Sequence, residues 1–249
     1  MAAAAAVPSG DDRSAPFAGS CRAGRAGGFT LNAAPARPAI PDGIVSGGVV
    51  AIARRVPASS VPSIAAALVG GGVRAFELTL NDPEDEALRS IEVAARSGPA
   101  LGLQVGAGTV LTIEAAERAV DAGAAFLVMP HLDPDLVRWA AERGVPALPG
   151  CATPTELLTA WRAGAAAMKV FPASSLGPSF VRECRGPFPG LPLLPTGGIS
   201  VENAASFIAA GAIGVGMGSW LIGDAEPAGV RDRASRIVAT VAAARAAGS

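Results

Sequence analysis

Apolar and polar positions alternate along the chain from Gly43 onward in a repeating order of strand and helix. Short runs of apolar residues are typical of strands buried on both faces, and longer amphipathic segments follow them. Several helices are predicted to begin at a proline behind a capping residue, as in Asp82-Pro83, Asp133-Pro134 and Thr153-Pro154. The predicted strands are 49–53, 75–80, 101–107, 126–129, 146–149, 167–171, 193–196 and 213–218, and the predicted helices are 61–70, 83–96, 113–122, 134–143, 154–163, 178–184, 201–210 and 229–246.

A glycine-containing junction recurs before alternate strands. It surrounds Gly72, Gly123, Gly164 and Gly211, and each interval has room for two strand-helix units. Four such pairs make eight units, which predicts an α/β fold of one domain, a (β/α)8 TIM barrel with its catalytic residues at the carboxyl ends of the strands. A doubly wound open sheet is the alternative, but no GxGxxG motif follows the first strand.

Residues 1–42 show no apolar periodicity and are rich in Ala, Gly, Pro and Arg. This composition predicts a disordered N-terminal extension, with the folded domain at 43–249. Asp11 and Asp12 follow the alanine run closely, which disfavours a secretory signal. We expect a cytoplasmic protein; an organellar transit peptide is the alternative, because four arginines lie in the extension.

Charge and composition narrow the classes of partner. The net charge is -1 and no basic block exceeds Arg54 and Arg55, so neither nucleic acid nor an anionic membrane surface is an expected partner. No apolar run reaches the roughly 18 residues of a membrane span. One histidine and three scattered cysteines predict free thiols, no metal site and no cofactor. We therefore expect a small-molecule partner.

Lys169 is the only lysine, and it stands within a predicted core strand. Burial lowers the pKa of a lysine and makes it an amine able to attack a carbonyl. Strand alternation places Glu77 and Thr79 on the face opposite Phe76 and Leu78, so Glu77 and Lys169 are both expected to face the barrel interior. The pair suits acid-base chemistry beside a Schiff-base lysine, and a structural ion pair is the alternative.

Glycines follow the last two predicted strands. Gly197 and Gly198 come after the seventh, and Gly218 and Ser219 after the eighth. Turns of this kind leave backbone N–H groups free for an anion, and the loops after strands 7 and 8 hold phosphate in many TIM barrels. The sequence therefore predicts a phosphate site there.

These motifs resemble those of the class I aldolases that cleave 2-keto-3-deoxy-6-phosphogluconate, together with their 4-hydroxy-2-oxoglutarate and 2-keto-3-deoxy-6-phosphogalactonate relatives. The resemblance covers about residues 45–222. It rests on VVAIAR, FELTL, VGAGTVL, PGCATPTE, MKVFPAS, PTGGIS and GSWL, each of which is similar to a strand motif of the family.

The resemblance implies a retro-aldol cleavage that yields pyruvate and glyceraldehyde 3-phosphate, without a metal. Lys169 would form the Schiff base and Glu77 would transfer protons. Arg54 and Thr109 would lie near the substrate carboxylate, and the substrate would be a phosphorylated 2-keto-3-deoxy sugar acid bound by a homotrimer. The predicted substrate-binding residues are Arg54, Thr109, Pro130, Phe171, Gly197, Gly198, Gly218 and Ser219.

Two departures from the family pattern leave the substrate epimer open. Asn81 stands where many gluconate-type enzymes carry arginine, and LNDP is closer to the galactonate type, whereas PTGGIS and GSWL favour the gluconate type. His131 replaces a glycine of the usual SPG loop; we expect it to face solvent, with substrate contact as the alternative. Alternatives of other classes are a phosphosugar epimerase, which would not need Lys169, and a non-catalytic phosphosugar-binding barrel.

Overall fold

The computed structural model describes residues 37–80 and 83–248. The strands are β1 (Val49–Ala53), β2 (Ala75–Thr79), β3 (Gln104–Gly108), β4 (Leu127–Val128), β5 (Ala147–Leu148), β6 (Gly150–Cys151), β7 (Met168–Val170), β8 (Leu193–Pro195) and β9 (Val215–Met217). The helices are α1 (Asp42–Gly47), α2 (Val61–Gly70), α3 (Glu84–Leu101), α4 (Ile113–Asp121), α5 (Pro134–Glu142), α6 (Pro154–Ala163), α7 (Ala173–Arg185), α8 (Val201–Ala209), α9 (Ser219–Ile222) and α10 (Pro227–Ala247).

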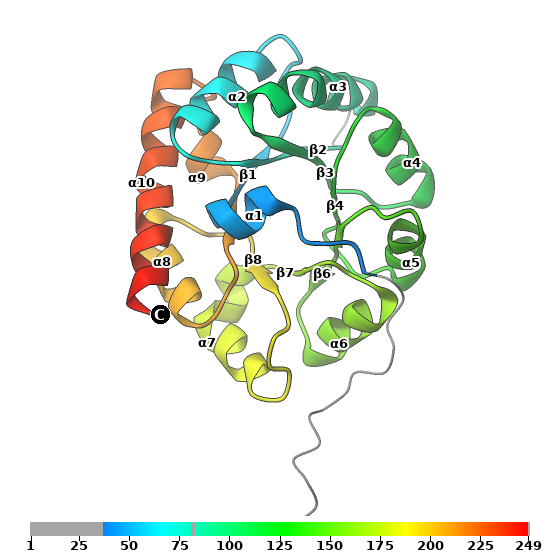
Figure 1. Ribbon diagram of the computed structural model, residues 1–249, viewed down its shortest axis with the longest axis vertical. Helices are drawn as coiled ribbons and strands as arrows, with labels where there is room; N and C mark the ends of the chain where they lie inside the picture. Colours follow the sequence, from blue (N-terminus) through cyan, green and yellow to red (C-terminus); the bar gives the residue numbers. More distant parts are fainter. Residues whose placement is uncertain (1–36, 81–82, 249) are drawn as a thin grey trace, which may run out of the picture. The chain divides into compact units, whose positions relative to one another are not determined.

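The strands are parallel and form two sheets. One has six strands in the order β5-β4-β3-β2-β1-β9, and the other has the order β6-β7-β8. The larger sheet curls into a half-barrel with helices outside it (Figure 1). β5 and β6 are consecutive and flank Pro149, and a bridge between Thr196 and Gly216 links the end of β8 to β9. The predicted α/β class with parallel strands is confirmed.

Two apolar clusters divide the side chains of the strands. The outer cluster packs strands against helices and includes Phe76 and Leu78. The inner cluster draws on strands of both sheets and contains Ile44, Val50, Ile52, Ala75, Phe126, Val128, Leu148, Ala167 and Leu194. Alternation along β2 therefore sends Phe76 and Leu78 outward and Ala75 inward, as the sequence predicts.

The predicted strands and helices are found near their expected places, with three differences. α3 continues past residue 96 through Pro99 to Leu101 and ends at Gly102 in a left-handed conformation, so the strand predicted from residue 101 begins only at Gln104, as β3. Gly98, which has no side chain, packs closely against Leu103 and Val105 in this last turn. α7 begins at Ala173, before the predicted start at residue 178, and Gly177 interrupts it. The short helices α1 and α9 were not predicted. Periodicity carries little signal over four to six residues.

The N-terminal part of the described chain closes the amino end of the strands. Ile44 in α1 is fully buried in the inner cluster, Ile40 packs against it, and the Gly43 amide donates to Gln104 Oε1 at 2.6 Å. Arg245 of α10 donates to the Ser46 carbonyl at 3.1 Å and also to the carbonyl of Ile213. The first and last helices of this unit are therefore tied together.

The predicted disordered extension reached residue 42, which is too far. The Arg37 guanidinium lies over the Trp161 ring at 3.0 Å and donates to the carbonyls of Trp161 and Ala165 at 2.8 and 3.1 Å. Burial lowers the pKa of Arg37 to about 10. Residues 37–42 thus belong to the folded unit, and the rest of the predicted extension, with its secretory and transit alternatives, lies outside the described residues.

Within residues 37–80 and 83–248, no helix is long and apolar enough to cross a membrane. Cys151 and Cys184 are both buried and free, and burial raises the pKa of the Cys151 thiol to about 12. Cys21 lies outside the described residues.

Gly106 offers a test of the inner packing. A Cβ added there would lie 2.3 Å from Cε2 of the Phe126 ring. We expect Gly106→Ala to lower the free energy of unfolding by about 1–3 kcal/mol, the usual cost of overpacking a core. Denaturant unfolding of Gly106→Ala, Phe126→Leu and the double variant measures it. The double variant should be more stable than the sum of the single effects predicts, because the smaller side chain leaves room for the methyl group. Additive losses would contradict this packing.

Candidate active site

Glu77 and Lys169 occupy inward positions on β2 and β7. Glu77 pairs in register with Ile52 of β1 and Gly106 of β3, and Lys169 pairs with Gly150 of β6. Their exposed fractions are 2% and 6%, so both ionisable groups are taken almost wholly out of water. This confirms the expected direction of both side chains.

Both side chains line a cavity of about 530 Å³ at the carboxyl ends of the strands. Most of the predicted site residues meet there, contributed by the segments that follow β1, β3, β7, β8 and β9. The cavity is lined by Ile52, Arg54, Glu77, Thr79, Thr109, Lys169, Phe171, Thr196, Gly197, Gly198, Ile199, Ser200, Gly216, Gly218, Ser219, Trp220, Ile222 and Gly223.

Burial is the main influence on the charge of the pair. It raises the pKa of Glu77, against the opposing effects of Lys169 and Arg54. It also lowers the pKa of Lys169, which the Glu77 charge raises and the Arg54 charge lowers further. Both shifts favour the uncharged forms, a carboxylic acid beside a neutral amine. These are the forms that an acid catalyst and a nucleophile need.

A structural ion pair does not describe the arrangement. Within the described part of the chain, the ion pairs at 4.0 Å or less join partly or fully exposed side chains, and none joins Glu77 to Lys169. Lys169 Nζ instead lies 4.7 Å from the centroid of the Phe171 ring. The ring is in turn close to Gly197, where an added Cβ would approach it to 3.1 Å.

Small residues on neighbouring strands make room for the pair. A Cβ on Gly108 would lie within 1.9 Å of Glu77 Oε1, so only glycine allows the carboxyl group its place over β3. On the other side, Thr79 donates to the Ala53 carbonyl at 3.2 Å, which fixes the end of β2 against β1. Glycine at position 108 thus leaves room for the Glu77 carboxyl group, and the strand end that carries it is fixed by Thr79.

Arg54 and Thr109 reach the cavity from the ends of β1 and β3. Arg54 is exposed, and its charge acts on both Glu77 and Lys169. Thr109 has a φ of 57°, and Arg55 next to Arg54 has a φ of 54°. Such left-handed conformations are uncommon outside glycine and gather at functional sites. A cation and a hydroxyl beside a nucleophilic amine can hold a substrate carboxylate.

The glycines after β8 and β9 form the opposite wall. Gly197 and Gly198 have φ values of 93° and 75°, in the left-handed region that favours glycine. An added Cβ on Gly198 would lie 2.6 Å from Ser174 Cβ, which makes the turn specific for glycine. Backbone amides in a glycine turn of this kind can bind an anion.

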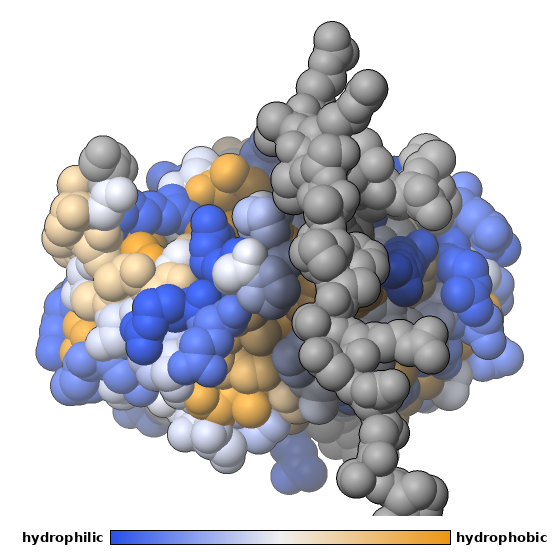
Figure 2. Space-filling model, turned by 90° about the horizontal axis from the view of Figure 1, so that it is seen from below, coloured by the Kyte–Doolittle hydropathy of each residue, from blue (hydrophilic) through white to orange (hydrophobic). Residues whose placement is uncertain are grey.

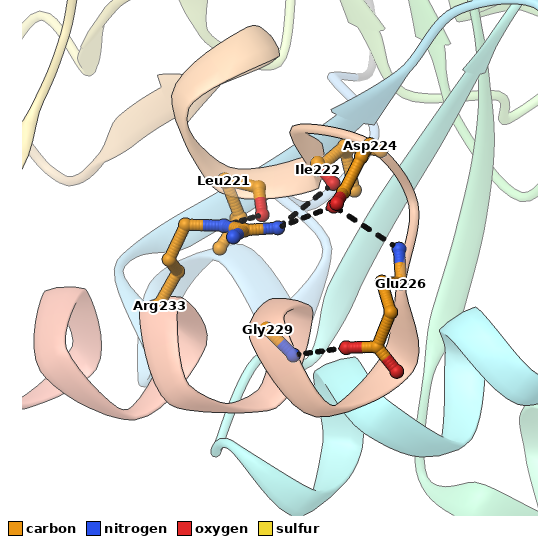
Figure 3. Close-up of polar contacts among 6 residues, drawn as sticks. All are labelled: Leu221, Ile222, Asp224, Glu226, Gly229 and Arg233. Atoms are coloured by element: carbon orange, nitrogen blue, oxygen red, sulfur yellow. Dashed lines mark hydrogen bonds and ion pairs between the residues drawn. The ribbon is translucent and has the colours of Figure 1, made fainter.

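The segment after β9 is held from behind by α10. Arg233 Nε donates to the Leu221 carbonyl at 2.9 Å, and its Nη2 donates to the Ile222 carbonyl at 3.0 Å (Figure 3). Asp224 lies 3.7 Å from the same guanidinium and accepts from the Glu226 amide at 3.3 Å, and Glu226 caps α10 by accepting from the Gly229 amide at 2.8 Å. α9 is therefore fixed to α10.

Three residues named from the sequence lie elsewhere. Pro130 and His131 do not line the cavity, and His131 is exposed, in agreement with the solvent-facing expectation. Asn81, on which the epimer argument depends, lies outside the described residues. Within those residues, no group of three or more His, Cys, Asp or Glu could hold a metal ion.

Sequence reasoning missed several residues of the cavity wall. Thr79 shares the inward face of β2 with Glu77, so alternation could have assigned it to the site. Thr196 and Gly216 face each other across the bridge between β8 and β9, and Trp220 lies on α9, which periodicity did not reveal. These three depend on how non-adjacent segments meet.

The chain is similar to several proteins named as aldolases. The family model described as "KDPG and KHG aldolase" matches residues 41–232. A probable 2-dehydro-3-deoxy-6-phosphogalactonate aldolase of Rhizobium meliloti is 41% identical over 195 residues, 78% of this chain and 90% of that protein. A 2-dehydro-3-deoxy-phosphogluconate aldolase of Pseudomonas aeruginosa is 37% identical over 171 residues, 68% of this chain and 74% of that protein.

A solved structure shows the same fold. KDPG aldolase from Legionella pneumophila, with pyruvate captured as a covalent carbinolamine intermediate, has a TM-score of 0.69 and 28% identity. The match covers 82% of this chain and 98% of that one.

The pKa of Lys169 can be measured directly, because labelled lysine gives a single side-chain signal in the NMR spectrum. We expect a value below the ordinary 10.5. Glu77→Gln should lower it further by removing a nearby negative charge, and Arg54→Gln should raise it by removing a positive one. A wild-type value at or above 10.5, or shifts of the opposite sign in the two variants, would show that the cavity does not act on the amine as described.

Proposed function

Because this chain belongs to the KDPG and KHG aldolase family, we propose that it cleaves 2-keto-3-deoxy-6-phosphogluconate to pyruvate and glyceraldehyde 3-phosphate through a Schiff base, with 4-hydroxy-2-oxoglutarate as a further substrate. The observation that carries the proposal is the buried amine of Lys169 in the wall of a cavity that also holds Glu77. The members named above are aldolases, which are lyases.

Imine formation uses the neutral amine that burial favours. The Lys169 nitrogen attacks the C2 carbonyl of the substrate, and a proton passes from nitrogen to oxygen to give a carbinolamine. Glu77 then protonates the hydroxyl group, water leaves, and the nitrogen lone pair forms the iminium. The raised pKa of Glu77 suits this step because it favours the protonated form of the carboxyl group.

In the cleavage step Glu77 acts as a base, and Lys169 supplies the nitrogen of the iminium. The Glu77 carboxylate removes the proton of the C4 hydroxyl group, C4 becomes an aldehyde, and the C3–C4 bond breaks as its electrons enter the iminium to give an enamine. Protonation at C3 and hydrolysis then release pyruvate and regenerate Lys169. The iminium accepts the electrons that a metal would polarise in another mechanism, so no metal or cofactor is proposed.

Binding groups surround this pair on two sides. Arg54 and Thr109 would hold the substrate carboxylate, and Phe171 would lie against the reacting carbons, since its ring is beside Lys169. Gly197, Gly198, Gly218 and Ser219 would hold the phosphate; their place in the cavity wall and the positive φ values of the first two support this. Pro130 remains a proposed binding residue that would have to act from outside the cavity wall.

Three further parts of the proposal concern the whole protein. The two sheets would together form the closed (β/α)8 TIM barrel, with β5 and β6 as one interrupted strand; the inner cluster shared by both sheets supports this. The aldolase domain would span residues 43–249, with residues 37–42 packed on it. We further propose that the protein is a cytoplasmic homotrimer. Its partner would be a phosphorylated 2-keto-3-deoxy sugar acid, and it would bind neither nucleic acid nor a membrane.

The galactonate epimer is the second candidate substrate. It is favoured by the identity of 41% to the Rhizobium meliloti protein and by the LNDP sequence at residues 80–83. A non-catalytic phosphosugar-binding barrel would keep the glycine turns but has no use for the buried pair of Glu77 and Lys169.

Trapping with pyruvate and borohydride tests the Schiff base. We expect one reduced adduct on Lys169, found by intact mass and peptide mapping, because only a neutral amine forms the imine. Lys169→Met should give none. Glu77→Gln should form the adduct about 10²-fold more slowly or worse, the usual scale for a positioned acid-base group. An adduct confined to the N-terminal amine, or none, would rule out the mechanism.

Comparing the two epimers as substrates tests which one the protein prefers. The two sugars differ only at C4, so we expect the gluconate form to have the higher kcat/KM by less than about tenfold, since discrimination rests on one hydroxyl group. Measuring both epimers under the same conditions gives the ratio, and Asn81→Arg should increase it. A galactonate preference of tenfold or more would instead establish the second candidate.

A further inference from the structure

Arg233 contacts α9, the short helix that lines part of the cavity, and is not itself a lining residue. Its guanidinium donates to the carbonyls of Leu221 and Ile222, at 2.9 and 3.0 Å, from α10 (Figure 3). Those two residues are buried, and Ile222 also lines the cavity. α9 therefore contacts both Arg233 and the cavity.

α9 depends on this support because it is short. Four residues make one turn, and the carbonyls at the end of a helix have no partner within it. The fork of Arg233 donates to two of them, those of Leu221 and Ile222, and the Ile222 carbonyl also accepts from the Ala225 amide at 2.9 Å. Gly223 ends α9 with a φ of 56°, and an added Cβ there would lie 2.8 Å from Arg233 Nη2, so the backbone is shaped closely around the guanidinium.

The ion pair with Asp224 adds little to this support. The two groups are 3.7 Å apart, and the Asp224 side chain is 77% exposed. Exposed pairs of this kind contribute about 0–1 kcal/mol. The carbonyl contacts, made by a side chain that is only 26% exposed, are the ones that fix α9.

We propose that Arg233 is a positioning residue for the phosphate end of the substrate, acting through α9 on Gly218 and Ser219. This rests on the proposed function, which assigns those two residues to phosphate. The phosphate of the substrate takes no part in the reaction, so loss of its binding should raise KM with little change in kcat. The acid Glu77 lies on β2 and the amine Lys169 on β7, whereas the hydrogen bonds and ion pair of Arg233 are made to Leu221, Ile222 and Asp224.

The test compares substrates with and without phosphate in Arg233→Met. We expect about a tenfold rise in KM for 2-keto-3-deoxy-6-phosphogluconate, the scale of losing hydrogen bonds from a charged group, with kcat within about threefold. The inhibition constant of inorganic phosphate should rise in parallel. The kcat/KM for 4-hydroxy-2-oxoglutarate, which has no phosphate, and the rate of pyruvate trapping at Lys169 should stay within about twofold.

Matched variants separate the effect of the Arg233 contacts with α9 from the effect of its positive charge. Arg231→Met removes the same charge from an exposed residue of the same helix, and Asp224→Asn removes only the ion pair; both should leave every constant within about twofold. Arg233→Lys keeps the charge but loses the fork, so it should give an intermediate KM and serves if Arg233→Met does not fold. Equal losses with both substrates, an unchanged KM, or the same effect from Arg231→Met would overturn the proposal. Wild-type protein that traps no pyruvate would overturn the aldolase function instead.

Discussion

Taking one carboxyl group and one amine out of water is the constraint on which the rest of this structure depends. Burial by itself would make either charge costly, and the pair is accommodated because both groups shift toward their neutral forms. The same shift that removes the cost gives an amine able to attack and an acid able to donate. Stability and reactivity therefore have one physical origin at this site.

Glycines next to Glu77 and Lys169 leave space for side chains, and apolar residues below the pair exclude water. Gly108 leaves space for the Glu77 carboxyl group, and Gly106 accepts the Phe126 ring one layer below. The inner cluster below them extends to Ile44, which seals the amino end of the strands. Inward-facing apolar side chains fill the interior toward the amino ends of the strands, and the inward-facing residues at the carboxyl ends leave the cavity open.

Most of this arrangement could be predicted from the sequence because it follows from local rules. Strand alternation directed Glu77 inward, and the only lysine in an apolar run identified Lys169. The contacts of Arg37 with Trp161 and of Arg233 with α9 could not be predicted, since each joins segments whose meeting depends on the whole fold. A single arginine and a four-residue helix have no periodic signature.

The link between α1 and α10 has a consequence for how this unit comes apart. Chain ends are usually the first parts of a domain to open, because nothing holds them on one side. Here Arg245 of the last helix is bonded to the carbonyl of Ser46 in the first, and Ile44 of that first helix is fully buried. Opening of either α1 or α10 breaks this bond, so we expect the two helices to open together rather than independently.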